Sequence, residues 1–76
     1  MNQFNRVVKV ASGRKWRTLR DLESVIIDRF NVADTQAAIS ARLRDISGLA
    51  RLKLAKETRT ERINNKTVWF YRLVKL

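Results

Sequence analysis

The sequence contains no cysteine, no histidine and no proline, and only 2 glycines. Without cysteine no disulfide can brace the chain, and without cysteine and histidine the usual ligands of a structural zinc site are missing. A chain of 76 residues is also too short to build a second hydrophobic core. We therefore expect a single domain over residues 1–76 that is held together by packing alone, with no metal and no other cofactor.

Long hydrophobic runs are missing as well. The longest, Val68–Tyr71, has 4 residues, whereas a membrane-spanning helix needs about 20. The start of the chain has no continuous apolar segment of the kind that signal peptides carry. These absences predict a cytoplasmic protein, associated with the nucleoid if it binds DNA, and they remove the membrane from the expected partners.

Groups that perform acid–base or nucleophilic chemistry are scarce. Besides the missing histidine and cysteine there is a single tyrosine, and no two acidic residues have the spacing of a metal site or of a general acid and base. Asp21, Glu23 and Asp28 instead fit the solvent-exposed face of a helix. The sequence thus predicts a protein that is not an enzyme and has no small-molecule substrate.

Acidic residues are outnumbered, 7 against 17 lysines and arginines, which gives a net charge of +10. Residues 1–20 carry six basic and no acidic groups (+6), residues 21–50 three and five (−2), and residues 51–76 eight and two (+6). Contacts with a polyanion are favourable because they release its condensed counterions. Two basic segments around a less charged centre therefore predict a folded body with two phosphate-facing surfaces.

Residues 3–11 and 19–30 are predicted helices because their apolar residues recur at spacings of three and four. The first ends before Gly13, and the basic stretch before Thr18 is expected to be extended. Thr18 precedes the second helix as an N-cap, and Asp21 follows in its first turn, where a negative charge suits the helix dipole.

A third helix is predicted over residues 35–46. Asn31–Asp34 joins it to the preceding helix, since asparagine adopts the left-handed conformation that ends many helices, and Asp34 or Thr35 can cap the third helix. Two amphipathic helices separated by such a short turn are typical of a helix-turn-helix.

After the third helix the pattern changes to that of a hairpin. Thr58–Ile63 alternates, Asn64–Lys66 has the composition of a turn, and Thr67–Leu73 is rich in β-branched and aromatic residues. Leu49–Lys56 fits both a helical extension and the beginning of a strand, and we favour a strand from about residue 54.

Side chains of the last strand alternate between two faces. Trp69, Tyr71 and Leu73 share one face, which we expect to cover the core, although aromatic residues in a basic groove could instead stack on single-stranded bases. The other face then exposes Val68 and Phe70, unless an opposing subunit or Leu54 covers them. This exposure favours a homodimer through that face, which Phe70→Ser should dissociate in sedimentation experiments.

The outer side of the third helix is small and polar, as a helix in the major groove of DNA, about 12 Å wide, must be. Glutamine pairs with adenine and arginine with guanine through two hydrogen bonds each, and alanine can touch a thymine methyl group. The alternative is an ordinary amphipathic surface helix. The candidate base-reading residues are Gln36, Ala37, Ser40, Ala41, Arg42 and Arg44.

Basic residues before the second helix and in the hairpin are candidates for DNA backbone contacts. The hairpin could lie along the sugar-phosphate chain and reach the minor groove, or its cations could merely protect exposed strand edges from mispairing. The candidates are Arg14, Lys15, Arg17, Thr35, Arg59, Arg62 and Lys66.

From Trp16 to Leu73 the chain resembles the small winged helix-turn-helix proteins of bacteriophages and prophages. The resemblance rests on RTLRDL at the start of the second helix, TQAAISARLRDI as the recognition helix, and TERINNKTVWFYRL as the wing and last strand. It implies an α+β winged helix-turn-helix fold, with three helices, a C-terminal two-stranded hairpin and a wing tip at Asn64–Lys66.

The resemblance also implies that the chain binds double-stranded DNA as a phage-type transcriptional regulator. One alternative within DNA binding is an excisionase-like architectural protein that bends its site. An alternative from another class is a phage inhibitor that docks on an acidic surface of a host protein through the same basic groups.

Overall fold

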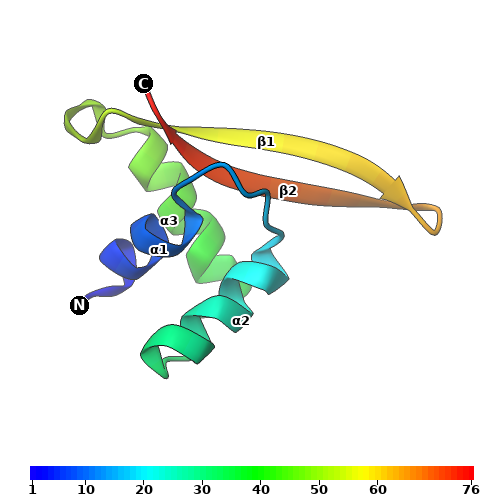
Figure 1. Ribbon diagram of the computed structural model, residues 1–76, viewed down its shortest axis with the longest axis horizontal. Coiled ribbons are helices and arrows are strands. Elements are labelled where there is room, and N and C mark those ends of the chain that lie inside the picture. Colours follow the sequence, from blue (N-terminus) through cyan, green and yellow to red (C-terminus); the bar gives the residue numbers. More distant parts are fainter.

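The computed structural model describes residues 1–76 as three helices followed by a two-stranded antiparallel hairpin, which is the α+β layout of a winged helix (Figure 1). The predicted fold class is confirmed. None of the helices combines the length and the apolar character that crossing a membrane requires. The elements are α1 (Gln3–Ala11), α2 (Leu19–Phe30), α3 (Gln36–Ser47), β1 (Leu54–Ile63) and β2 (Lys66–Lys75).

Local capping explains where the helices begin and end. Thr18 and Asp21 form a reciprocal capping box, in which each side chain accepts a hydrogen bond of 3.0 Å from the other residue's backbone N–H. The α2 helix ends at Asn31, whose φ of 54° is left-handed, as predicted. The N-cap of α3 is Thr35 and not Asp34, so this helix begins and ends one residue later than predicted.

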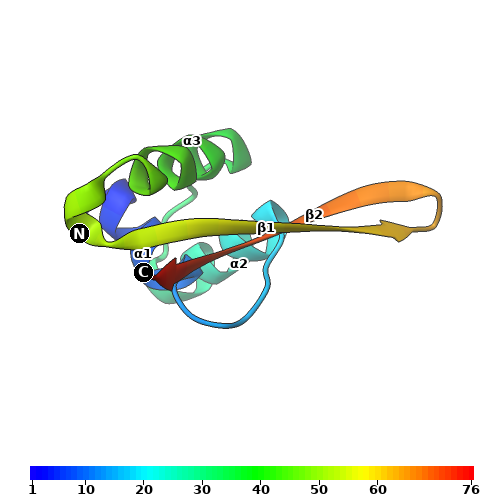
Figure 2. The same cartoon turned by 90° about the horizontal axis from the view of Figure 1, so that it is seen from above.

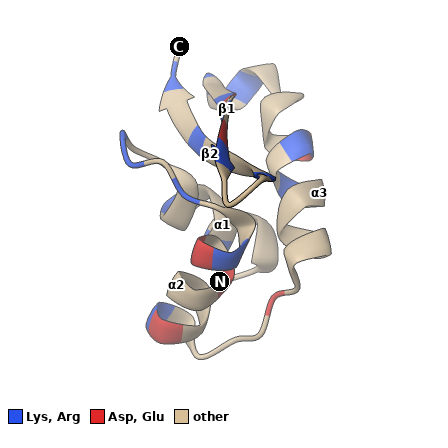
Figure 3. Cartoon of the chain, turned by 90° about the vertical axis from the view of Figure 1, so that its right-hand side faces the viewer, with Lys and Arg blue, Asp and Glu red and all other residues tan.

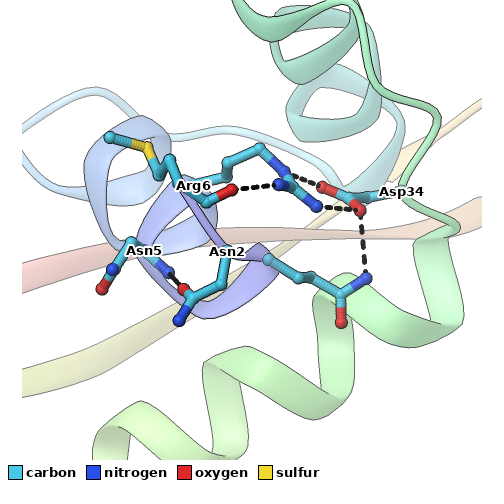
Figure 4. Close-up of polar contacts among 6 residues, drawn as sticks. Asn2, Asn5, Arg6 and Asp34 are labelled. Carbon is cyan, nitrogen blue, oxygen red and sulfur yellow. Dashed lines mark hydrogen bonds and ion pairs between the residues drawn. The ribbon is translucent and has the colours of Figure 1, made fainter.

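Asp34 lies in the turn between α2 and α3 and does not cap α3. Its carboxylate instead binds side chains of α1 (Figure 4). Arg6 donates from Nε to Oδ2 at 2.8 Å and from Nη2 to Oδ1 at 2.9 Å, and Gln3 Nε2 donates to Oδ1 at 3.0 Å. The hydrogen bonds from Arg6 lower the pKa of Asp34 below its ordinary value, against the opposing effect of burial. The N-terminus of α1 is thereby fixed to the turn that orients α3.

The core lies where the three helices meet the base of the hairpin, on one side of the sheet (Figure 1). Burial of apolar surface is the main favourable contribution to such a fold. The buried apolar residues are Val7, Val10, Ala11, Leu22, Ile26, Ile39, Leu43, Ile46 and Leu73.

The ambiguous segment after α3 contains both kinds of structure. Ala50–Leu52 forms one 3-10 turn, Lys53 adopts a left-handed φ of 50°, and β1 starts at Leu54, as favoured from the sequence. The left-handed residue redirects the chain, so that β1 runs back alongside α3 (Figure 2).

The turn of the hairpin has two residues, Asn64 and Asn65, with φ values of 50° and 63°. Two consecutive positive φ angles define a type I′ turn, whose twist matches that of a β-hairpin. The sequence placed Lys66 in the turn, and this prediction is wrong. Lys66 is the first residue of β2, where it pairs with Ile63. The last strand is also longer than predicted, since β2 continues past Leu73 to Lys75.

The connection between α1 and α2 is attached to the two-stranded sheet by two isolated β-bridges, between Ser12 and Leu73 and between Arg17 and Tyr71. Arg17 and Tyr71 exchange two backbone hydrogen bonds, of 3.0 and 2.7 Å. Gly13 donates to the carbonyl of Leu73 at 3.0 Å with a φ of 125°, a conformation that glycine adopts without strain. The connection is thus attached to β2 at both of its ends, and of the stretch predicted to be extended only Arg17 pairs with β2.

Candidate nucleic-acid interface

The inner side of α3 is fixed by three buried residues, Ile39, Leu43 and Ile46. Its opposite side faces solvent, because helix geometry places residues between these positions away from the core. Of the six candidate base-reading residues, the structure exposes Gln36, Ala37 and Arg44 and half-buries Ser40, Ala41 and Arg42. The small, polar outer side expected from the sequence is therefore accessible over most of the helix.

Gln36, at the first turn of α3, is oriented by α2. Its Nε2 donates a hydrogen bond of 3.1 Å to Oε1 of Glu23. The second amide hydrogen and the carbonyl oxygen stay available, which is the pair of groups that adenine recognition requires. The contact with Glu23 holds the side chain ready for such a pairing.

The two arginines of α3 differ in their freedom. Arg42 lies beside the buried stripe, pairs with Asp45 at 3.0 Å, and has a buried Nε without a hydrogen-bond partner. Arg44 is exposed and forms no ion pair. Arg44 is therefore the arginine of α3 that is free to reach a guanine.

Thr35, the N-cap of α3, lies where a phosphate would meet the positive end of the helix dipole. Its Oγ1 accepts a hydrogen bond of 3.1 Å from the backbone N–H of Ala38. The hydroxyl hydrogen stays free to donate to a phosphate oxygen.

Strand register divides the hairpin into two faces, because directly opposite residues of an antiparallel pair lie on the same side. We call the face that packs on the helices, through Leu73, the helix-side face, and the opposite one the outer face. The helix-side face comprises Leu54, Lys56, Thr58, Thr60, Arg62, Thr67, Trp69, Tyr71, Leu73 and Lys75. The outer face comprises Ala55, Glu57, Arg59, Glu61, Ile63, Lys66, Val68, Phe70, Arg72 and Val74.

Charge is distributed unequally between these faces. The helix-side face carries Lys56, Arg62 and Lys75 and no acidic residue, a net charge of +3. The outer face carries three basic residues and both acidic residues of the hairpin, Glu57 and Glu61, which leaves +1. The helix-side face is therefore the one on which an anion meets no carboxylate of the hairpin.

Arginines of the outer face are engaged within the chain. Arg59 pairs with Glu61, and its guanidinium carbon lies 5.8 Å from the ring centre of Trp16 and 6.0 Å from that of Phe70. Arg72 pairs with Glu57 at 2.6 Å. Arg59, predicted to contact the DNA backbone, is therefore held by aromatic and acidic neighbours.

The apolar residues of the outer face are partly covered by this arrangement. Val68 and Phe70 are half-buried, with Arg59 over the Phe70 ring. Leu54 does not contribute, because it lies on the helix-side face and packs on the core. The homodimer expected through Val68 and Phe70 stays a prediction.

Trp69 is placed differently from the expected core position. It shares the helix-side face with Tyr71 and Leu73, as the alternation predicted, but it is 52% exposed. The reason is the length of the hairpin, whose distal half projects past the helices (Figure 1). Alternation identified the face of Trp69, but it carries no information on where the helices stop covering that face.

Basic residues lie on both sides of the hairpin, in α3 on one side and in the connection before α2 on the other (Figure 3). Arg14 and Lys15 are exposed, and Arg17, whose backbone pairs with that of Tyr71, is half-buried. The hairpin tip adds Arg62, whose Nη2 donates to the carbonyl of Asn65 at 3.5 Å. Lys66 beside it is exposed.

Most of the basic residues have no acidic partner. Four of the 17, namely Arg6, Arg42, Arg59 and Arg72, form ion pairs, which leaves 13 unpaired. Internal pairing uses four of the 7 acidic residues, so it cannot neutralise the surface. The excess positive charge is therefore available to an external anion.

No family model, no curated protein and no solved structure matches this chain. Its own residues supply an exposed, slender outer side on α3, an adjoining hairpin with an acid-free face, and unpaired cations on both.

Proposed function

We propose that this chain binds double-stranded DNA, with α3 in the major groove and the hairpin on the adjoining backbone, and that it acts as a transcriptional regulator of the phage type. The observation that carries the proposal is the position of α3. Its outer side is open to solvent, and the helix packs alongside β1. Residues able to recognise bases and residues able to hold phosphates thus occupy adjoining surfaces.

Exposure and ion pairing indicate which residues would contact bases and which would contact phosphates. Gln36 and Arg44 have free donor and acceptor groups for base edges, while Ala37 and Ala41 keep the helix slender enough for close approach. Thr35, at the helix N-terminus, is suited to a phosphate. Base contacts would supply specificity and phosphate contacts most of the salt-dependent affinity.

The unpaired cations of the hairpin and of the connection before α2 would hold the two flanks of the duplex. Arg14 and Lys15 are exposed on one side, and Arg62 and Lys66 at the hairpin tip. Each phosphate contact adds close to one unit to the slope of log affinity against log salt concentration. Affinity is therefore expected to fall steeply with salt.

The test is a fluorescence anisotropy titration with a duplex of random sequence, at salt concentrations from about 50 to 200 mM. Binding that weakens steeply over this range supports the proposal, and a selection from a random duplex library then identifies the preferred site. A circular-permutation gel shift with that site distinguishes a regulator from a protein whose main role is bending. Absence of binding to any duplex at the lowest salt overturns the proposal in favour of docking on an acidic protein.

A further inference from the structure

Trp69 is the one tryptophan that the chain leaves uncovered. Trp16 lies under the guanidinium of Arg72, and Phe70 under that of Arg59. Tyr71 packs against the core. Trp69, by contrast, is 52% exposed and has no cation over its ring. An exposed indole is a large apolar surface, and this one has no internal partner.

The neighbours of Trp69 on the helix-side face are hydroxyl groups and a cation. Thr60 lies directly opposite, and the next pair towards the tip is Arg62 with Thr67. Thr58 lies on the other side, opposite Tyr71. Threonine hydroxyls and arginine donate hydrogen bonds to phosphate and sugar oxygens, and nothing in this set repels an anion.

The outer face offers the opposite combination. Its two acidic residues form ion pairs, Glu57 with Arg72 and Glu61 with Arg59. Arg72 in turn covers the ring of Trp16, and Arg59 that of Phe70. A duplex approaching the outer face would have to break these contacts or meet their carboxylates. On the helix-side face it meets an acid-free surface.

We propose that the wing binds DNA through its helix-side face, with Trp69 in the minor groove. The proposal rests on the proposed function and adds to it which face is used and which residue lies at its centre. The indole would lie against sugars and base edges, since apolar side chains enter the minor groove in this way, and its N–H can donate to the acceptors on the groove floor. Arg62 and the threonines would hold the flanking phosphates, and Arg59 would brace Trp16 from the outer face.

Two matched substitutions test which face is used. Thr67→Glu places a carboxylate on the helix-side face, opposite Arg62, and Ile63→Glu places one on the outer face, opposite Lys66. Both sites are exposed and lie within two residues of the turn, and both substitutions lower the net charge by one. The general loss of attraction is therefore the same for both, and the difference between them reports the contact face.

We expect Thr67→Glu to weaken binding to duplex DNA at least about ten-fold, because its carboxylate would meet the phosphates directly. Ile63→Glu should cost at least about three-fold less than that, because its carboxylate only offsets the charge of Lys66 on the outer face. Circular dichroism and thermal melting confirm that both variants fold. Equal losses in the two variants, while the unmodified protein binds, overturn the choice of face and leave the proposed function intact. Absence of duplex binding by the unmodified protein overturns both.

Trp69 itself is tested by fluorescence, because the chain contains 2 tryptophans and Trp16→Phe leaves Trp69 as the only one. Saturation with an unlabelled duplex should quench its emission strongly. Trp69→Val should weaken binding at least about five-fold, because it removes most of the apolar surface that would lie in the minor groove. The control is Val68→Ala, on the outer face next to it, which should change affinity less than about two-fold. Unchanged emission at saturating duplex overturns the role of Trp69.

Discussion

The guanidinium carbon of Arg72 lies 4.2 Å from the centre of the Trp16 indole ring. The same guanidinium donates to Glu57 Oε1 at 2.6 Å and to the backbone carbonyl of Arg14 at 2.9 Å. One side chain of β2 therefore fastens the basic connection between α1 and α2 to the outer face of the hairpin. This contact holds the cations of the connection, Arg14 and Lys15, beside the sheet.

Arg72→Ala is expected to lower the free energy of unfolding by about 1–2 kcal/mol, since it removes a cation–π contact and two charge-assisted hydrogen bonds at a partly exposed site. Urea denaturation measures the loss. Hydrogen exchange should be faster at the backbone amides around Trp16 and unchanged at those of α3. Arg72→Lys keeps the charge but lacks the planar fork, so it should recover only part of the stability. A midpoint unchanged in both variants would contradict this account of the contact.

Arg44→Ala is expected to cost about 1–3 kcal/mol on the selected DNA site, because a bidentate contact to guanine would be lost, and only a small fraction of that on random duplex. Anisotropy titrations on both duplexes measure the difference. The control is Arg42→Ala, since Arg42 is already paired with Asp45 and half-buried. Equal losses on both duplexes for Arg44→Ala would remove its base-reading role.

The helices could be predicted because residues at or near their ends determine where they begin and end. Apolar spacing defined α1 and α2, and the capping residues Thr18 and Asn31 mark both ends of α2. Where two local signals competed, as for Asp34 and Thr35, the sequence left the cap open. The structure decides between them through a distant partner, because Arg6 binds the Asp34 carboxylate and leaves the cap to Thr35.

The sequence could predict which residues are candidates for the site. It could not predict which of them the fold leaves exposed and unpaired on one surface. Exposure of Gln36 and Arg44 follows from helical periodicity, which is a local property. The engagement of Arg59 and the exposure of Trp69 depend instead on how far the hairpin projects past the helices and on where the connection before α2 crosses it. Those are tertiary relationships that strand alternation does not encode.

Two substitutions at one position of the hairpin turn are expected to change the free energy of unfolding in opposite directions. Asn65 has a φ of 63°, in the left-handed region, and the second residue of a type I′ turn is most often glycine. Asn65→Gly is expected to raise the free energy of unfolding by a few tenths of a kcal/mol, and Asn65→Ala to lower it by about 1 kcal/mol, because alanine pays a steric cost there. Urea midpoints check both. A lowered midpoint for glycine would mean that the Asn65 side chain itself stabilises the turn.

The Arg6–Asp34 pair makes stability depend on acid pH. Hydrogen bonds from Arg6 hold the pKa of Asp34 below its ordinary value, so the folded state binds a proton less readily than the unfolded state. The resulting stabilisation is complete above the pKa of unfolded aspartate, about 3.9, and is lost as the pH falls from there through the lower pKa of the folded state. Arg6 keeps its charge throughout this range, because a guanidinium loses its proton only in strong alkali, and the contact with Asp34 raises its pKa further.

The matched variant is Asp34→Asn, which keeps the size of the side chain and removes its titration. At neutral pH it should be less stable than the unmodified protein by about 2 kcal/mol, since the hydrogen bonds to a buried carboxylate become bonds to a neutral amide. Between about pH 5 and pH 2 the difference should shrink, because only the unmodified protein loses this contribution on acidification. Thermal melting at several pH values measures both curves, and the remaining acidic residues act on the two alike. A difference that stays constant down to the acid end would show that the carboxylate is held by packing and not by its charge.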